Sequence, residues 1–256
     1  PMKIASWNVN SLKIRLPQLL GWLGSEHPDI VCLQETKLED SGFPRLEIEA
    51  CGYRPIFAGQ KTYNGVALLT RESASDVVVG NPFLHDEQMR LLTATVRGIC
   101  VVCAYVPNGQ AVGSQKYDYK LAWLDALRRW IGERLRGNPH LILAGDFNIA
   151  PEDRDVHDPI AWAGQILCSD AERSAHRALL DLGLHDSFRL FAQAEKSFSW
   201  WDYRMLGFQK NHGLRIDHIL LSSPLAARCT AAGIRREMRK LQRPSDHAPV
   251  TAELTD

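Results

Sequence analysis

The sequence has no long hydrophobic run and few cysteines. Its longest uninterrupted apolar run, 99–106, is far shorter than the roughly 18 residues that a membrane-spanning helix needs, so we expect no membrane association. The N-terminus, Pro1-Met2-Lys3, leads directly into strand-like sequence without an apolar signal region, which predicts a cytoplasmic protein. Six cysteines among 256 residues are too few for a disulfide framework, and because most lie inside apolar runs we expect buried thiols.

Several motifs that mark enzyme classes or metal sites are also absent. The chain has no G-x-S-x-G, G-x-x-x-x-G-K-[ST], H-E-x-x-H or G-x-G-x-x-G pattern. Cys100 and Cys103 form a C-x-x-C, but residues three apart on a strand lie on opposite faces and cannot share a metal ion. No repeat, low-complexity tract or linker divides the chain, so we predict one domain over residues 1–256.

The overall composition is that of a globular protein, with 45% hydrophobic and 23% charged residues and a formal net charge of +0. The charge is unevenly placed, because residues 189–243 hold 11 lysines and arginines against 4 acidic residues. Two interpretations remain open for this basic segment: a surface that holds a polyanion with stackable rings, or a solvated face above core aromatics. Its aromatic residues include Phe198, Trp200, Trp201, Tyr203 and Phe208.

Short strand-like runs alternate with helical patterns along the chain. Strands are expected at 2–9, 30–33, 65–70, 76–79, 91–96, 99–106, 141–144, 214–221 and 250–254. Apolar residues at helical spacing predict helices over 16–23 and 114–136, and a capping box of Ser169 and Glu172 predicts a third helix that ends near Gly183. Many strands and few helices in mixed order favour an α/β sandwich, with two β-sheets face to face and helices outside.

Polar side chains stand where several of these strands give way to loops. Each could serve only its local turn or a buried ion pair, but acids and amides are disfavoured in strands and buried carboxylates need partners or a metal. We therefore expect them to converge on one site at the rim of the sheets. The residues are Asn8, Glu35, Asp146, Asn148, Asp217, Asp246 and His247.

The chemistry of this set is that of a hard divalent cation and a phosphate. Carboxylate and amide oxygens from Glu35, Asp246, Asn8 and Asn148 suit Mg²⁺ or Mn²⁺, and the lack of a Cys/His cluster argues against structural zinc. A metal held by few carboxylates indicates a phosphate substrate. A histidine beside them can act as acid or base, or can stabilise charge on a phosphate oxygen.

Six motifs in one order resemble the exonuclease III/AP endonuclease branch of the endonuclease/exonuclease/phosphatase superfamily. They span almost the whole chain, and the set is far more specific than any single tetrapeptide. The resemblance implies a four-layered α/β sandwich, two mixed sheets packed face to face with helices outside. The motifs are W-N-V-N at 7–10, L-Q-E-T-K at 33–37, N-G-V-A-L-L at 64–69, G-D-F-N-I at 145–149, G-L-R-I-D at 213–217 and P-S-D-H-A-P at 244–249.

The resemblance also implies Mg²⁺-dependent hydrolysis of DNA phosphodiesters, at abasic sites and at 3′ ends of damaged double-stranded DNA in base-excision repair. By motif position, Glu35 would be the principal metal ligand, with Asn8 and Asp246 nearby and Mn²⁺ as a substitute ion. Asp146 would activate the attacking water and Asn148 would hold it against the phosphate. We expect a monomer.

Further roles follow from the same resemblance. His247, oriented by Asp217, would bind the scissile phosphate, and Tyr105 would contact the same group with Asn108 beside it. Arg90 lies where the family carries a DNA-contacting arginine or its neighbour.

A pocket for a flipped-out sugar is the remaining expectation. Trp200 and Leu214 match positions that line it in the family, although plain core packing would explain both equally well. The loop at 155–173 resembles the better-known members least. Leu167, in a stretch that looks exposed, is a candidate for the bulky residue with which some paralogues lose abasic-site incision and keep 3′-phosphatase and 3′-exonuclease activity.

Three alternatives to a general AP endonuclease therefore remain. The first is such a 3′-end-processing paralogue. The second is a relative that uses another phosphate ester, such as a phosphoinositide, sphingomyelin or RNA. The third is a non-catalytic DNA-binding protein, which would be expected to have lost one of the catalytic residues.

Overall fold

Two six-stranded mixed sheets form the centre of the molecule in the computed structural model, which describes residues 1–256. Strands β1 and β2 pair in parallel, as do β7 and β8, and the other pairs are antiparallel. The first sheet has the order β13 (Cys229–Ile234), β14 (Val250–Leu254), β1 (Met2–Asn8), β2 (Ile30–Gln34), β4 (Val66–Thr70) and β3 (Arg54–Ala58). The second has the order β5 (Ala74–Val79), β6 (Leu91–Val96), β7 (Ile99–Tyr105), β8 (Leu141–Asp146), β12 (Asp217–Ser222) and β9 (Leu184–Asp186).

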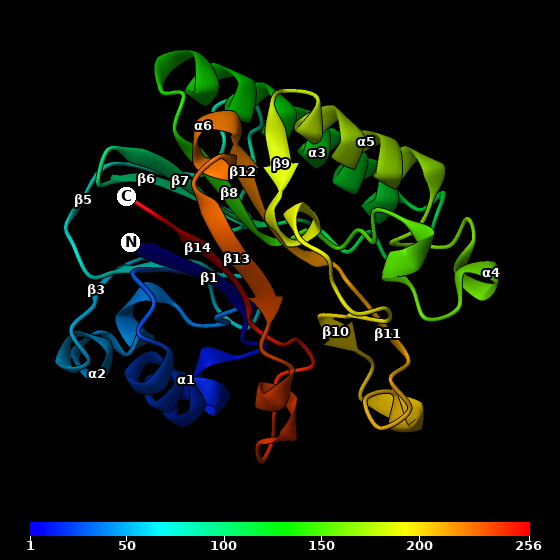
Figure 1. Cartoon of the computed structure of the whole chain (residues 1–256), viewed down its shortest axis with the longest axis horizontal. Helices are drawn as coiled ribbons and strands as arrows, with labels where there is room; N and C mark the ends of the chain where they lie inside the picture. The colour runs from blue at the N-terminus through cyan, green and yellow to red at the C-terminus, as the bar shows by residue number, and fades with distance from the viewer.

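Helices cover the outer face of each sheet, giving four layers (Figure 1). Helices α1 (Leu12–Glu26) and α2 (Arg45–Ala50) lie against the first sheet, and α3 (Gln115–Gly137) and α5 (Asp170–Leu180) lie against the second. The expected α/β sandwich is confirmed. Shorter elements are α4 (Pro159–Trp162), α6 (Ser223–Ala226), the hairpin of β10 (Trp200–Trp201) and β11 (Gly213–Leu214), and 3₁₀ turns at Asp40–Gly42, Asp153–Asp155, Ser187–Leu190, Arg204–Leu206 and Arg236–Lys240.

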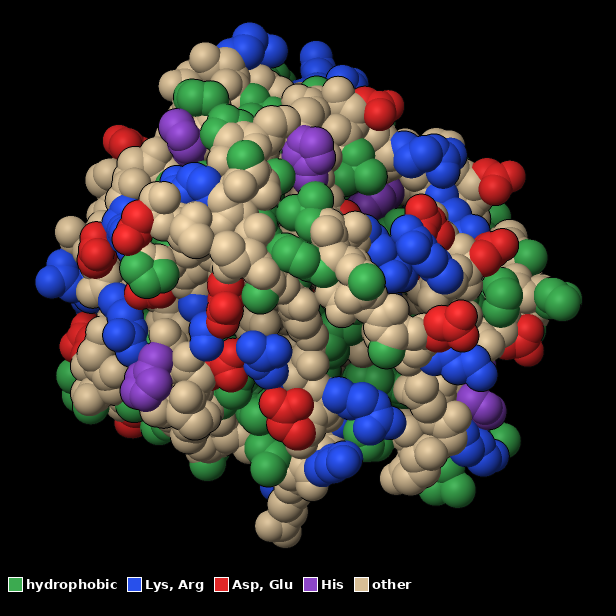
Figure 2. All heavy atoms as spheres, viewed as in Figure 1, with side chains coloured by type: hydrophobic (Ala, Val, Ile, Leu, Met, Phe, Trp, Pro, Cys, Tyr) green, Lys and Arg blue, Asp and Glu red, His purple; other side chains and the backbone are tan.

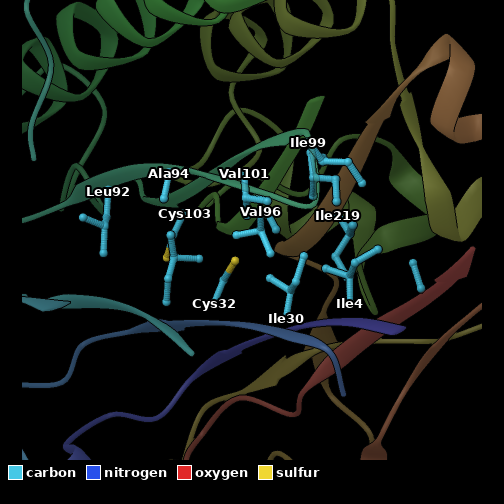
Figure 3. Close-up of a cluster of buried hydrophobic side chains, with 14 of the residues drawn as sticks. Ile4, Ile30, Cys32, Leu92, Ala94, Val96, Ile99, Val101, Cys103 and Ile219 are labelled. Carbon is cyan, nitrogen blue, oxygen red and sulfur yellow. The ribbon is translucent and has the colours of Figure 1, made fainter. Parts of the chain in front are cut away.

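The central core lies between the two sheets. Figure 3 shows Ile4, Ile30 and Cys32 pointing from the first sheet toward Val101 and Cys103 of the second. These side chains are fully buried, so the two sheets share one apolar layer that excludes water. The shared layer fixes the position of one sheet on the other, and with it the residues at the sheet rims.

Most predicted elements are found with shifted ends. The run predicted at 214–221 is two strands, β11 and β12, because Arg215 and Ile216 leave the ladder. The sequence patterns did not predict strands β3, β9, β10 and β13 or the short helices α2, α4 and α6. β3 contains Pro55, and β13 is built largely of small residues (C-T-A-A-G-I), so neither carries the β-branched alternation that marks a strand.

The cysteines are all free thiols. Cys100 packs under α3 and Cys103 packs between the sheets, on opposite faces of β7 as expected. The expectation of buried thiols is wrong for Cys51, which is exposed, and for Cys229, which is half-buried. No helix is both long and apolar enough to cross a membrane.

One rim of the sandwich collects the ends of six strands. β1 and β2 run in parallel and end opposite each other at Asn8 and Gln34, and β7 and β8 end together at Tyr105 and Asp146. Antiparallel β12 begins at Asp217, directly opposite Asp146, and β14 begins just after His247. The two sheets therefore bring all of these strand ends to the same edge.

Candidate active site

The site is a hydrogen-bonded cluster that joins the rims of both sheets. Asn8 donates from Nδ2 to Glu35 Oε1 at 2.9 Å and to Asp146 Oδ2 at 2.9 Å. His247 Nε2 lies 3.6 Å from the same Asp146 oxygen. Since Asn8 and Asp146 come from different sheets, this cluster exists only when the sandwich is closed.

Strands β7 and β8 approach so closely at Gly145, just before Asp146, that only glycine fits there. A Cβ atom at Gly145 would lie 1.8 Å from the carbonyl oxygen of Ala104 on β7. No other residue allows this contact without moving the strand. The glycine of the G-D-F-N motif thus sets the position of the acid that follows it.

Candidate metal-ligand atoms of Glu35, Asp146 and His247 lie within 4.8 Å of one another. Two carboxylates at this spacing fit a hard divalent cation. Of the three predicted ligands only Glu35 belongs to this group. Asn8 turns its amide nitrogen toward the carboxylates while its oxygen accepts the backbone N–H of Asn10, so in this arrangement Asn8 orients the carboxylates.

Asp246, also predicted as a metal ligand, lies at the margin of the cluster. Its carboxylate accepts hydrogen bonds from Trp200 Nε1 at 3.1 Å and from Asn10 Nδ2 at 3.2 Å. The distance from Asp246 Oδ1 to His247 Nε2 is 4.0 Å. The assignment of Asp246 and Asn8 to the metal stays a prediction.

His247 is held as a cation by two carboxylates. Its Nδ1 lies 2.8 Å from Asp217 Oδ2, which leaves Nε2 directed at Asp146. Burial opposes the charge, but Asp217 and Asp146 outweigh it and raise the pKa of His247 well above its ordinary value. Ser199 Oγ donates to the same Asp217 oxygen at 2.7 Å and so fixes the carboxylate that orients the ring.

Asp146 has the environment of a base that works near neutral pH. Burial, with the negative charges of Asp217 and Glu35, raises its pKa to about 7, although His247 and Asn8 act in the opposite direction. A general base is most effective when its pKa is close to the operating pH. The side chain is only 1% exposed.

Glu35 is kept ionised in the same cluster. Burial raises its pKa, but the hydrogen bond from Asn8 and the charges of His247 and Lys37 lower it below the ordinary value. Its backbone has a φ of 54°, in the left-handed region that a non-glycine residue enters only at a cost of about 1–3 kcal/mol. Such strain is found where the surrounding structure over-determines a functional position.

Asn148 is held at every polar group. Its N–H donates to Asp146 Oδ1 at 3.0 Å, and its Nδ2 donates to the Val106 carbonyl at 2.8 Å. Asn108 Nδ2 lies 3.4 Å from Asn148 Oδ1, so these two predicted residues are neighbours. With a φ of 50°, Asn148 is a second strained residue in the site.

Tyr105 and Arg90 complete the cluster on the side of β7. Burial and the charges of Glu35 and Asp146 raise the pKa of Tyr105 well above its ordinary value, so its hydroxyl stays protonated. The Arg90 guanidinium lies 4.6 Å from the centre of the Tyr105 ring and donates to the Tyr105 carbonyl at 3.2 Å. Arg90 and Asn108 also line an open hollow of about 590 Å³ beside the site, together with Lys116.

Trp200, Leu214 and Leu167 form part of one apolar cluster next to the site. Trp200 and Leu214 face each other across the β10–β11 hairpin, and Leu214 is fully buried. The expectation that Leu167 lies in an exposed stretch is wrong, because its side chain is only 4% exposed and packs in this cluster with Val156. Leu167 has a φ of 75°, in the left-handed region that non-glycine residues rarely adopt.

A model of the endonuclease/exonuclease/phosphatase family matches residues 5–247 of the chain. The chain belongs to this family. Membership makes it a hydrolase of the nuclease and phosphatase type, which agrees with the acid, base and cation assembled at the sheet rims. The family is metal-dependent, and in the cluster of Glu35, Asp146 and His247 the two carboxylates are the candidate metal ligands, because a protonated His247 has no free nitrogen lone pair.

Relatives within the family cover the whole chain. Exodeoxyribonuclease III of Haemophilus influenzae is 39% identical over 98% of this chain and 99% of its own. A solved structure of the 3′ phosphatase NExo (D146N) from Neisseria, bound to product DNA hairpin, is 46% identical with a TM-score of 0.98 and full coverage of both chains. An AP endonuclease from Archaeoglobus fulgidus is 36% identical with a TM-score of 0.96, again over both full chains.

The basic segment, residues 189–243, offers fewer unpaired positive charges than its composition indicates. Four of its arginines are engaged in ion pairs, which removes them from the charge available to a ligand. The exposed remainder includes Arg236 and Lys240. In Figure 2, lysine and arginine side chains gather over the region where Figure 1 has the lower ends of β13 and the β10–β11 hairpin. The paired arginines are Arg189, Arg204, Arg215 and Arg235.

The aromatic residues of the segment divide between core and surface. Phe198 and Trp201 are buried, so core packing is the correct interpretation for these two. Arg236 and Arg239 lie over the Phe208 ring at 4.2 and 4.9 Å. The Phe208 ring therefore contacts both guanidinium groups, and cation–π contacts of this kind hold the positive charges in place.

Sequence reasoning missed the residues that position the catalytic set. Ser199 supports Asp217, and Ser245 accepts the backbone N–H of His247 at 3.1 Å. Lys120 donates to the Asn148 carbonyl at 2.6 Å and is paired with Glu172. Two of these residues had a signal in the sequence. Ser245 lies in the P-S-D-H-A-P motif at 244–249, and Glu172 lies in the capping box at the start of α5, which indicates only a helix start.

Proposed function

We propose that this protein is a Mg²⁺-dependent DNA-repair nuclease that removes phosphate groups and nucleotides from damaged 3′ ends of double-stranded DNA. The observation that carries the proposal is the Asp146–His247–Asp217 arrangement beside Glu35, which places a base and a buried cation 3.6 Å apart. The presence of every predicted catalytic residue in one cluster favours an enzyme over a DNA-binding relative without activity. The DNA enzymes among the relatives favour DNA over lipid or RNA esters.

In the proposed reaction, a water held by the amide of Asn148 gives a proton to Asp146 and bonds to the phosphorus. The bond from phosphorus to the 3′ oxygen of the DNA breaks, and that oxygen takes up a proton from the solvent. Protonated His247 and the Tyr105 hydroxyl stabilise the charge that develops on the phosphate oxygens, with Asp217 keeping the imidazolium oriented. A Mg²⁺ ion bound by Glu35, together with Asp246 if that carboxylate turns inward, would supply further positive charge at the phosphate. Mn²⁺ has the same ligand preference and would substitute.

Leu167 favours 3′-end processing over incision at abasic sites. A flipped-out sugar needs an open apolar pocket, and Leu167 occupies apolar space beside Trp200 and Leu214. The NExo relative, named as a 3′ phosphatase, is more similar in sequence than the Archaeoglobus AP endonuclease. Abasic-site incision, the activity named for that AP endonuclease, is the second candidate function.

A gel assay with two labelled duplexes tests the proposal. One duplex carries a recessed 3′-phosphate and the other an internal abasic-site analogue, each incubated with Mg²⁺, with Mn²⁺ or with EDTA. We expect removal of the 3′-phosphate with either metal, no reaction in EDTA, and little incision at the abasic site. Activity that persists in EDTA would refute the metal-dependent mechanism.

Replacing Leu167 tests the origin of the lesion preference. Leu167→Gly removes the side chain, and glycine tolerates the φ of 75° at this position. We expect abasic-site incision to rise at least about tenfold while 3′-phosphatase activity changes little, because the pocket opens and the catalytic cluster is untouched. Ile160→Gly in the same loop is the matched control, since Ile160 is 90% exposed. Equal incision by all three proteins would show that Leu167 does not set the preference.

We further propose that the protein acts as a monomer in the cytoplasm, in base-excision repair. The bacterial relatives, exodeoxyribonuclease III of Haemophilus influenzae and the exodeoxyribonuclease of Bacillus subtilis, support a bacterial setting for this activity.

A further inference from the structure

A fully buried ion pair lies directly beneath the active site. Lys120 of α3 and Glu172 of α5 form a salt bridge, and both side chains are 0% exposed. Burying two charges removes their hydration, and this loss is recovered only if the remaining donors and acceptors are satisfied. A pair that served only to join two helices would be replaced by apolar side chains at no loss of stability.

Every proton of the Lys120 ammonium is directed to a specific acceptor. One goes to Glu172, one to the backbone carbonyl of Asn148 at 2.6 Å and one to the carbonyl of Asn108 at 3.1 Å. A lysine ammonium has three donors, so none is left over. These two backbone carbonyls belong to Asn108 and Asn148, whose side-chain amides lie next to each other in the catalytic cluster.

Glu172 extends the same network to the pocket loop. Its Oε2 accepts the backbone N–H of Leu167 at 3.0 Å, and its Oε1 accepts the Ser169 hydroxyl at 2.7 Å. The carbonyl of Leu167 in turn accepts the N–H of Ala150, two residues beyond Asn148. One ion pair therefore holds the catalytic loop and the loop that carries Leu167.

The residues at both ends of this network are strained. Asn148 and Leu167 have φ values of 50° and 75°, in the left-handed region that non-glycine residues keep only where the surroundings hold them. The hydrogen bonds from Lys120 and to Glu172 are made by the backbone of these same two residues. The ion pair thus acts at the points where the backbone would otherwise relax.

We propose that Lys120 and Glu172 are positioning residues that set both the water-orienting amide of Asn148 and the position of Leu167 in the pocket. The inference rests on the proposed function, because the geometry that it fixes is that of the phosphate-hydrolysing site. The ion pair joins two otherwise separate properties of the enzyme, its turnover and its lesion preference, through a single buried ammonium.

The double variant Lys120→Met/Glu172→Leu tests the proposal, since it replaces the pair by apolar side chains of similar length. We expect it to melt within a few degrees of the unchanged protein, with kcat on the 3′-phosphate duplex about 10–100-fold lower and KM changed by less than about threefold. The exposed pair Asp125 and Arg128 on α3 supplies the control, Asp125→Leu/Arg128→Met, which should keep both constants. A folded Lys120→Met/Glu172→Leu protein with kcat within about threefold of the unchanged enzyme would overturn the proposal.

A measurement without substrate separates this inference from the proposed function. Amide hydrogen exchange at Leu167 and Asn148 in the free protein should be at least about tenfold faster in the Lys120→Met/Glu172→Leu variant, and unchanged exchange would overturn the positioning role. Lack of 3′-end activity in the unchanged enzyme would refute the proposed function alone. Should the double variant not fold, Lys120→Arg keeps the charge and donors, and kcat no higher than that of Lys120→Met would count against positioning.

Discussion

Asp146 is the site residue whose pKa is most clearly set by its surroundings. It ends β8, faces Asn8 and His247, and has a pKa near 7 because it is buried beside other carboxylates. A pKa close to the pH of the cell suits the role of general base that we propose for this residue. The hydrogen-bond partners of this side chain are all members of the site.

Asp146→Asn should therefore reduce kcat by about 10²–10⁴-fold, because it removes the base and leaves the phosphate-binding groups in place. Steady-state kinetics on the 3′-phosphate duplex measures the effect, and fluorescence anisotropy should find DNA affinity nearly unchanged. Asp76→Asn, at an exposed position on β5, is the control. Turnover by Asp146→Asn close to that of the unchanged enzyme would contradict the role of this residue.

At the scale of elements, helix α5 places a buried, neutral histidine, His176, against the residue that follows β8. His176 stacks edge-on against Phe147 at 5.7 Å and lies 5.2 Å from the ring of His218 on β12. Burial lowers the pKa of His176 to about 3 and that of His218 to about 4, and the nearby Arg215 adds to both effects. Neither ring nitrogen of His176 has a hydrogen-bond partner in the protein.

These two histidines make the fold sensitive to acid. An unfolded histidine takes up a proton below about pH 6.5, whereas the buried rings stay neutral to about pH 3–4, so stability falls as the pH drops through this interval. Each histidine contributes a slope of up to about 1.4 kcal/mol per pH unit.

His176→Leu should reduce the pH dependence of the free energy of unfolding by about one proton between about pH 6 and pH 4.5. It should also stabilise the protein at neutral pH, because it removes a buried polar ring without partners. Urea denaturation at several pH values measures both, with His85→Leu, at an exposed position outside this cluster, as control. An unchanged slope would show that His176 is already charged or exposed in the folded protein.

At the scale of the whole molecule, positive charge is unequally distributed although the net charge is zero. The exposed Arg236 and Lys240 lie in the basic segment, where aromatic rings support the arginine. Acidic residues elsewhere balance the total. A DNA duplex that approaches this face would release counterions even though the protein carries no overall charge.

DNA affinity should fall steeply with salt, by about 10³-fold between about 50 and 200 mM if about six phosphates are neutralised. Arg236→Gln/Lys240→Gln should lower the slope of log K against log salt by about two, and anisotropy titrations of a duplex measure it. Lys13→Gln, on the exposed side of α1, should leave the slope unchanged. A flat salt response would exclude this face as a DNA-binding surface.

The sequence alone determined the α/β sandwich and most members of the site. Alternating apolar runs and capping signals are local, so most strands and the three long helices could be predicted without knowing their partners. The exceptions are β3, β9, β10 and β13 and the short helices α2, α4 and α6. Acids and amides at strand ends, such as Asp146 and Asp217, point to a rim site for the same local reason. The single domain over residues 1–256 stays a prediction from composition.

Only the tertiary structure decided what surrounds those residues. The orientation of the Asn8 amide, the burial of Leu167 and the pairing of Lys120 with Glu172 each depend on contacts between segments far apart in the chain. A lysine on an amphipathic helix is ordinarily solvated, and nothing in its neighbours along the sequence marks Lys120 as an exception. Its burial follows from the packing of α3 on α5 over the strand ends, because only there do two backbone carbonyls and a carboxylate meet its charge.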